Sequence, residues 1–558
     1  MTEPITADVC IVSGRVFDGR IRTADTAVAL AGTRILAVGD DDHIRAHAGP
    51  ATRVIDAQGG LIHPGFVDAH AHAAFAGVER LSCDLTGART VDETLALIVD
   101  AAAATDAEWV TGGGWSHELF PEPTRQMLDE LIPDRPVALS DAGHHTLWVN
   151  SLALERAGVD CDTPQPPNGH ISRDGDGNPT GYLNETAAEL VGRVIPPATE
   201  AEIVAGLRNA QAHLWSIGVT GWHEAILGEY NGKADCTNAY RKTIEDGSLR
   251  SRVSGALWVP PGVTVGDIPA LVADFTARRE ENSRAGFSTT TAKAMVDGVP
   301  HGGTAALLDP YCAHAGQIGT GELHISPEAL DALVVALDAE GFAMHLHIMG
   351  DRGARVALDA VEQARRTNGP GPRHHFAHLS MVHPDDARRF GPLGVTANVQ
   401  ALWASEDHAV VPMIGEARMR AGYPFRSLLN SGADLAMGSD WPVSPADPWL
   451  AIHVAVNRSL PGPSGPSAPL DAGQALTLTE ALAAYTSGSA ELVLGDGGRL
   501  RVGERADVVV ATVDPFELPL DALIETGTAL TIVGGQIVHE LRAPSTASDL
   551  THPEEGHR

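Results

Sequence analysis

The sequence predicts an α/β protein: a (β/α)8 TIM barrel with a β-sandwich domain built from both termini and an insertion after the first barrel strand. Three observations predict it. Both ends of the chain are rich in short strand-like segments. The middle alternates strand-like and helical segments, which is typical of a parallel sheet covered by helices. The number of these units and the length of 558 residues favour a barrel over a short doubly wound sheet.

Residues 1–62 form the first part of the predicted sandwich. The segments 8–19, 26–39 and 52–62 are apolar and are separated by Gly and Asp turns. Residues 498–542 return to the same pattern and form its second part. Residues 543–558 are polar and are expected to be a disordered tail.

Residues 63–497 form the predicted barrel. In the unit 326–341, Ser326 can cap a helix, Pro327 suits its first turn, and Gly341 can end it. An apolar strand-like segment, "FAMHLHIMG", follows at once. The alternation is weaker between about 80 and 200, where turn residues are frequent. This stretch is predicted to be an insertion over the mouth of the barrel.

Composition excludes several classes of partner. The chain is 43% apolar and 20% charged, with 39 basic and 72 acidic residues and a formal charge of −33. Such a surface repels nucleic acid and anionic membranes, so neither is an expected partner. The N-terminus lacks the pattern of a secretory signal, and no apolar window is long enough to span a bilayer. Five scattered cysteines without a CxxC pair predict a reduced, cytoplasmic protein.

The 25 histidines are the unusual feature of the composition. Many stand at the ends of apolar runs, where a (β/α)8 barrel carries its functional groups. Each alone could be an ordinary core histidine, and a lone HxH is common by chance. Four separate strand ends together favour a site for zinc or a similar divalent ion. The residues in question are His70, His72, Lys293, His345, His347, His374, His375, His378 and Asp440.

The chain resembles the amidohydrolase superfamily, and specifically the family-3 amidohydrolases of the YtcJ-like type, which include N-substituted formamide deformylases. The resemblance rests on segments that run over nearly the whole chain in the family's order. They include "HPGFVDAHAH", "GHHTLWVNSLAL", "AKAMVDGVPHGGTAALLDPY", "HLHIMGDRG", "HHFAHLSMVHPDD" and "MGSDWPVSPADPW". These motifs are specific for the family and not for the substrate.

The resemblance implies a metal centre with one or two divalent ions, zinc being the expected metal. His70 and His72 would bind the more buried ion, with Asp440 as a further ligand. Lys293 would be carboxylated on its amine and would bridge two ions if the centre is binuclear. A free lysine is a cation at neutral pH, so it cannot ligate until it has lost its proton.

Two further histidines would bind the second ion. His378 matches the strand-six motif. His347, rather than His345, matches the strand-five motif because it directly precedes "IMGD".

The expected reaction is hydrolysis of a C–N bond in an amide, N-formyl or cyclic amide group of a small-molecule substrate. Metal-bound hydroxide would attack the carbonyl, and Asp440 would act as the general base. A metal-dependent lyase, decarboxylase or isomerase on the same scaffold is the alternative, because a fold does not determine its chemistry. A non-catalytic binding protein is a third reading. A homodimer is the family-level expectation for the assembly, and the oligomeric state stays open.

Four further residues are candidates for contact with the substrate. His145 lies in the family motif "GHHTLWVN", and Trp115, His301 and Trp441 lie beside other matching segments. A tryptophan in such a place is more often part of the core or of a lid.

Overall fold

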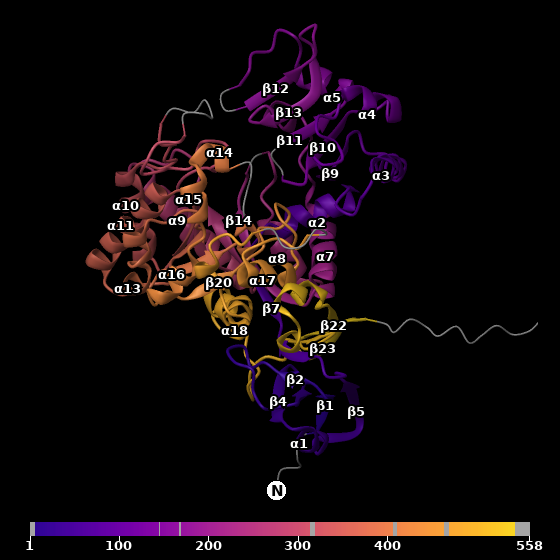
Figure 1. The fold of residues 1–558 in the computed structure, drawn as a ribbon, viewed down its shortest axis with the longest axis vertical. Helices are drawn as coiled ribbons and strands as arrows, with labels where there is room; N and C mark the ends of the chain where they lie inside the picture. Colours follow the sequence, from indigo (N-terminus) through magenta and orange to yellow (C-terminus); the bar gives the residue numbers. More distant parts are fainter. Residues whose placement is uncertain are drawn as a thin grey trace, which may run out of the picture.

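The computed structural model describes residues 6–143, 146–166, 169–230, 232–312, 319–405, 410–462 and 468–541. Its centre is an eight-stranded parallel sheet that is nearly closed into a barrel, with a smaller sheet above and a β-sandwich below in the view of Figure 1. No helix of the described residues is long and apolar enough to cross a membrane.

The barrel strands follow the order β20-β19-β18-β17-β16-β15-β14-β7, and every neighbouring pair is parallel. All of them carry buried residues along most of their length, as expected for strands covered on both faces. The strands are β7 (Phe66–Ala71), β14 (Val219–Leu227), β15 (Arg252–Trp258), β16 (Ser288–Met295), β17 (Ala343–Ile348), β18 (His375–His378), β19 (Thr396–Val399) and β20 (Leu435–Met437).

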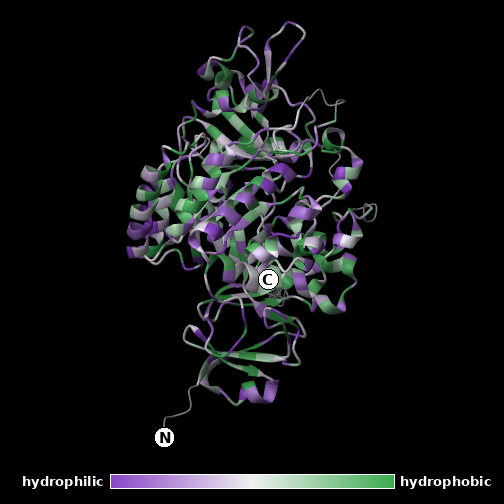
Figure 2. Ribbon diagram, turned by 90° about the vertical axis from the view of Figure 1, so that its left-hand side faces the viewer, coloured by the Kyte–Doolittle hydropathy of each residue, from purple (hydrophilic) through white to green (hydrophobic). Residues whose placement is uncertain are grey.

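Amphipathic helices cover the barrel. In α10 (Pro327–Ala339), the Ser326 hydroxyl accepts from the Ala329 amide at 3.2 Å, as the sequence predicts for a cap. Figure 2 shows hydrophilic and hydrophobic residues alternating along the outer helices. The other helices of the barrel region are α2 (Ala73–Leu81), α7 (Glu200–Ser216), α8 (Thr237–Glu245), α9 (Ile268–Arg284), α11 (Asp351–Asn368), α12 (Pro384–Ala387), α13 (Phe390–Leu393), α14 (Val411–Ile414), α15 (Glu416–Arg420), α16 (Phe425–Asn430), α17 (Pro448–Asn457), α18 (Leu478–Ala483) and α19 (Ser489–Val493).

Two sheets from the ends of the chain share one apolar core. One has the order β4-β3-β1-β5 and the other the order β2-β6-β21-β22-β23, so N- and C-terminal strands pair in the same sheet. Ile11 and Val28 of the first sheet pack in one cluster with Val508 and Ile532 of the second. The strands are β1 (Ala7–Val12), β2 (Arg15–Val16), β3 (Ala27–Ala31), β4 (Arg34–Gly39), β5 (Ala48–Asp56), β6 (Leu61–Pro64), β21 (Val508–Ala511), β22 (Thr528–Val533) and β23 (Gln536–Glu540); the short helix α1 (Asp41–Arg45) lies beside them.

The chain between β7 and β14 forms a separate sheet with the order β12-β13-β11-β10-β9-β8. It packs its own apolar clusters on both faces, so it is a folded unit rather than a long loop. Its elements are β8 (Cys83–Asp84), α3 (Val91–Ala103), β9 (Val110–Trp115), α4 (Arg125–Leu131), β10 (Val137–Asp141), β11 (Thr146–Val149), α5 (Ser151–Ala157), β12 (Gly169–Arg173), β13 (Pro179–Glu185) and α6 (Ala188–Gly192).

The apolar run Leu61–Val67 is divided between the sandwich and the barrel. β6 belongs to the sandwich sheet and β7 opens the barrel, with Gly65 between them. A Cβ atom at Gly65 would lie 2.1 Å from the Thr220 hydroxyl oxygen, so only glycine allows this close approach. The chain therefore passes from the sandwich to the barrel through Gly65 alone, without a linker.

Candidate metal centre

The barrel gathers six polar side chains at the carboxyl ends of its strands. They come from β7, β16, β17 and β18 and from the turns that follow β7 and β20, and they line one cavity of about 1500 Å³. In a parallel barrel this edge is where functional groups meet. The six residues are His70, His72, Lys293, His347, His378 and Asp440.

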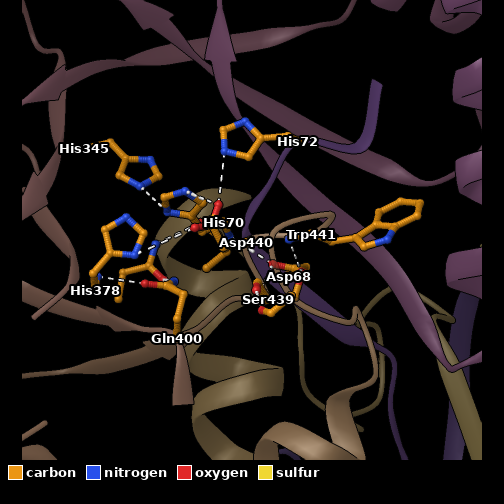
Figure 3. Close-up of polar contacts among 12 residues, drawn as sticks. Asp68, His70, His72, His345, His378, Gln400, Ser439, Asp440 and Trp441 are labelled. Carbon is orange, nitrogen blue, oxygen red and sulfur yellow. Dashed lines mark hydrogen bonds and ion pairs between the residues drawn. The ribbon is translucent and has the colours of Figure 1, made fainter. Parts of the chain in front are cut away.

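Asp440 lies at the centre of three imidazoles (Figure 3). Its Oδ1 atom is 3.2 Å from His70 Nε2 and 3.1 Å from His72 Nε2, and its Oδ2 atom is 3.9 Å from His378 Nδ1. The His378 and His347 rings are 4.5 Å apart between centroids. Four imidazoles from the ends of three strands and one carboxylate thus share a small volume.

The backbone around Asp440 is held against β7. The Asp440 amide donates to the His70 carbonyl at 2.7 Å, and the Ser439 amide donates to the buried Asp68 carboxylate at 2.9 Å. Asp440 and His378 have φ values of +60° and +74°. Left-handed backbone at non-glycine residues is strained, and such strain gathers at functional sites.

Burial sets the protonation of these groups. Desolvation lowers the pKa of His70 to about 3, and it lowers the pKa of Lys293 to about 7. Although burial alone raises the pKa of Asp440, the neighbouring His70, His72 and His378 hold it well below its usual value. A neutral His70 imidazole beside the ionised Asp440 carboxylate is in the state that a divalent cation requires of its ligands.

The geometry fits a cation of the size of zinc. The distances of 3.1 and 3.2 Å from Asp440 Oδ1 to the two imidazole nitrogens match the spacing of roughly 3.3 Å between ligands that bind tetrahedral zinc at about 2.0 Å. His378 Nδ1 is buried and has no hydrogen-bond partner. One ligand atom each from His70, His378 and Asp440 lies within 4.8 Å of the others.

A second group of histidines lies deeper in the barrel, below the first. His223 of β14, His345 of β17 and His375 of β18 are each at most 1% exposed, and they offer nitrogens within 4.8 Å of one another. The sequence marks His345 and His375 as histidines of strand-like segments, but it does not bring His223 to them. Period-two alternation from His347 would have placed His345 in the barrel interior.

Two buried carboxylates that no sequence motif marks lie behind the candidate ligands. Glu224 Oε1 is 3.9 Å from His72 Nδ1, and Asp297 Oδ1 is 3.8 Å from His347 Nδ1. Desolvation raises the pKa of Glu224 to about 7. Asp297 accepts from the amides of Met349 and Gly350 and so ties β17 to the end of β16.

The four candidates for substrate contact have different surroundings. His301 lines the cavity, and His145 lies outside the described residues. The Trp115 indole is buried in the insertion and donates to the Leu139 carbonyl at 2.9 Å. Trp441 is 6% exposed and packs on His213, 5.2 Å between ring centroids. The structure thus gives both tryptophans a packing role rather than a place in the cavity wall.

Comparisons with known proteins find chains that are similar in sequence and in fold. The chain is 29% identical to a putative amidohydrolase, YtcJ, of Bacillus subtilis over 88% of this chain and 92% of that protein. It is 27% identical to an N-substituted formamide deformylase of Arthrobacter pascens over 94% of this chain and 98% of that protein. Among solved structures, an uncharacterized metal-dependent hydrolase from Pyrococcus furiosus has a TM-score of 0.69 and 26% identity, and it covers 90% of this chain and 98% of that one.

The family model described as "Amidohydrolase family" matches residues 53–539, which include every residue of the candidate centre. By this match and its eight-stranded parallel barrel, the chain belongs to the amidohydrolase family.

Proposed function

We propose that this protein is a metal-dependent amidohydrolase that cleaves a C–N bond in an amide, N-formyl or cyclic amide group of a small molecule. The observation that carries the proposal is the convergence of Asp440 with His70 and His72 at 3.2 and 3.1 Å on the wall of a large cavity. The matches to the formamide deformylase and to the Pyrococcus hydrolase support it.

The metal would be zinc or a similar divalent ion, bound once or twice per chain by the six residues of the centre. Such an ion lowers the pKa of water toward about 7 and polarises a carbonyl oxygen. Lys293 is suited to bridge two ions because its burial leaves a large neutral fraction of the amine near pH 7. The neutral amine can add to CO2 and lose a proton, and the product is an anionic carbamate with two ligand oxygens.

Asp440 would move the proton. Its carboxylate is ionised and faces the cavity, so it can accept a proton from the attacking water. The leaving amine needs a proton when the C–N bond breaks, and the same carboxyl group can return it. One residue thus serves as base in the first half of the reaction and as acid in the second.

The cavity sets the kind of substrate. Its barrel side is lined mainly by apolar side chains, which favour an uncharged body on the substrate: Phe75, Met295, Val299, Met349, Met381, Trp403, Ile414 and Met419. The charge of −33 argues against nucleic acid as a partner.

The test is metal content together with product analysis. Protein purified without added metal or chelator is measured by inductively coupled plasma mass spectrometry and is then incubated with N-substituted formamides and N-acyl amines. Near two equivalents of metal with release of an amine would support the binuclear hydrolase. Near one equivalent of metal per chain would be consistent with hydrolysis but would contradict a carbamate bridge between two ions. Turnover without an amine product would favour the lyase or isomerase reading, and no metal with no activity after addition of zinc would contradict the proposal.

A further inference from the structure

His70 has a partner on each of its two ring nitrogens (Figure 3). Nε2 faces Asp440, and Nδ1 lies 2.9 Å from His345 Nε2. Both rings are buried, with His70 1% and His345 0% exposed. The contact joins the candidate ligands to the deeper histidines. The position of the hydrogen on the His70 ring therefore depends on which nitrogen of His345 carries a hydrogen.

We propose that His345 is a positioning residue that holds His70 in its metal-binding tautomer; this inference rests on the proposed function. A neutral imidazole has one lone pair and one N–H. When His70 offers its lone pair at Nε2, its hydrogen lies on Nδ1 and needs an acceptor. His345 Nε2 stands at hydrogen-bond distance and accepts it, so the orientation and the tautomer of His70 follow from one contact.

The proposed acceptor for the His70 hydrogen is a neutral imidazole, whereas the neighbours of two other histidines of the site are carboxylates. The Nδ1 atoms of His72 and His347 have carboxylates as their charged neighbours, Glu224 at 3.9 Å and Asp297 at 3.8 Å, both beyond hydrogen-bond distance. His70 instead meets a neutral ring. A neutral acceptor fixes the tautomer without adding a further negative charge beside Asp440 and Asp68.

The hydrogen count also decides what the deeper cluster can be. With its lone pair at Nε2 directed to His70, His345 carries its hydrogen on Nδ1, a buried atom without a hydrogen-bond partner among the described residues. The side-chain amide nitrogen of Asn398 can only donate, and it lies 3.3 Å from His375 Nδ1. His375 Nδ1 is therefore the acceptor, and the hydrogen of this ring lies on Nε2. Two of the three rings have therefore committed their lone pairs elsewhere. The cluster of His223, His345 and His375 supports the ring of His345 and does not bind a second cation while these bonds are kept.

Packing keeps His345 in place. Its ring lies 4.3 Å from His375 and 5.3 Å from His223 between centroids, and β17 pairs in register with both β16 and β18 at this point. His223 is held in turn by Ser254, 2.8 Å from Nδ1. His223 belongs to the same buried cluster, and its hydrogen bond goes to Ser254 and not to His70. It is therefore the matched control.

The experiment measures zinc and cobalt affinity of the full chain by competition with a chelating dye, and the visible spectrum of the cobalt form. His345→Leu removes the acceptor and keeps an apolar body, and we expect a loss of affinity of roughly 10- to 100-fold with an altered cobalt spectrum. His345→Gln carries an acceptor oxygen near the place of Nε2 and should restore most of the affinity. His223→Leu should keep affinity within roughly threefold of the wild type.

A double-mutant cycle shows whether His345 acts through His70. His70→Ala should weaken binding by itself, and His345→Leu should then cost nothing further. Full additivity of the two losses, or equal losses for His345→Leu and His223→Leu, would overturn the inference. Loss of one whole metal equivalent in both His345→Leu and His223→Leu would also overturn it and would identify the cluster as a metal site. Wild-type affinity in His70→Ala would contradict the metal centre itself, which is a different failure.

Discussion

Asp440 is the residue on which the proposed chemistry depends most. Its carboxylate stays ionised because three imidazoles surround it in a buried place. Replacing it by Asn removes the charge and the proton acceptor while the size of the side chain is kept. The Asp440→Asn variant therefore tests the proposed mechanism directly.

Asp440→Asn should lower kcat by roughly 10²- to 10⁴-fold, the range expected for loss of a general acid or base. The measurement is the steady-state rate of amine release, with metal content determined on the same sample. The exposed Asp162→Asn is the control and should leave the rate unchanged. An Asp440→Asn protein that binds metal and turns over at the wild-type rate would contradict the role as base.

The sequence marks nine polar residues in strand-like segments, and the family resemblance selects six of them as ligand candidates. The choice of His347 over His345 came from the family motif and stays a prediction; in the structure, His347 lines the cavity. The contact of His345 with His70 could not be predicted. These residues are 275 positions apart in the chain, and only the closure of the barrel brings them to 2.9 Å.

At the scale of elements, the end of β20 is held against β7 by a close approach at Gly438. A Cβ atom there would lie 2.5 Å from the His70 amide nitrogen and 2.8 Å from the His70 Cβ. The backbone must shift to make room for a Cβ atom at this position. Ser439 and Asp440 are the next two residues, so the shift would displace the carboxylate of Asp440.

We expect Gly438→Ala to lower metal affinity or kcat by roughly 10- to 100-fold, because displacement of a site by about 1 Å has effects of this size. The measurement is zinc affinity and the rate of amine release. Gly87→Ala, where a Cβ atom meets nothing within 4 Å, is the control. Wild-type affinity and rate in Gly438→Ala would show that the contact between β20 and β7 tolerates the shift.

A buried carboxylate joins α10 to α11 and to the start of β18. Asp338 accepts from Arg365 at 2.6 Å, from Asn368 at 2.9 Å and from His374 Nε2 at 3.0 Å. Although burial alone raises the pKa of Asp338, these donors lower it to about 2. The pKa of Asp338 in the folded state lies below the unfolded value of about 3.9. The ionised Asp338 therefore stabilises the folded state above pH 4, and this stabilisation is lost as the pH falls toward 2.

We predict that Asp338→Asn lowers the free energy of unfolding by about 2 kcal/mol at pH 7 and flattens its decline between pH 4 and pH 2. Thermal unfolding followed by circular dichroism at stepped pH values checks this. The exposed Asp385→Asn should keep the wild-type profile. A parallel decline of wild type and Asp338→Asn over this range would show that another group is responsible.

At the scale of the whole molecule, the sandwich and the barrel are joined directly. β6 ends at Pro64 in the sandwich and β7 begins at Phe66 in the barrel. The Thr531 hydroxyl of β22 donates to the Trp215 carbonyl at the end of α7, at 2.7 Å. Loss of the sandwich core should therefore affect the strand that carries His70.

Ile532→Ala should destabilise the protein by roughly 2–5 kcal/mol, because Ile532 is fully buried between the two sheets of the sandwich. The midpoint of urea unfolding measures the effect, with retention of metal followed in the same titration. Ile537→Ala, at a partly buried position on β23, should cost less. Equal midpoints for Ile532→Ala and the wild type would mean that the sandwich does not limit stability.

From the sequence alone follow the contrast between strand-rich ends and a βα-repeating middle, and the candidate polar residues at the ends of several barrel strands. These follow from local periodicity, caps and turns, which each segment carries alone. The tertiary structure decided which of those strand ends meet and which side chains stand behind them. Glu224 and Asp297 lie 3.9 and 3.8 Å from candidate ligands of neighbouring strands, and His345 contacts His70 across the barrel. Neither hydropathy nor spacing records such contacts. The contact between Asp440 and His70 exists only because β7 and β20, at the two ends of the sheet order, come together.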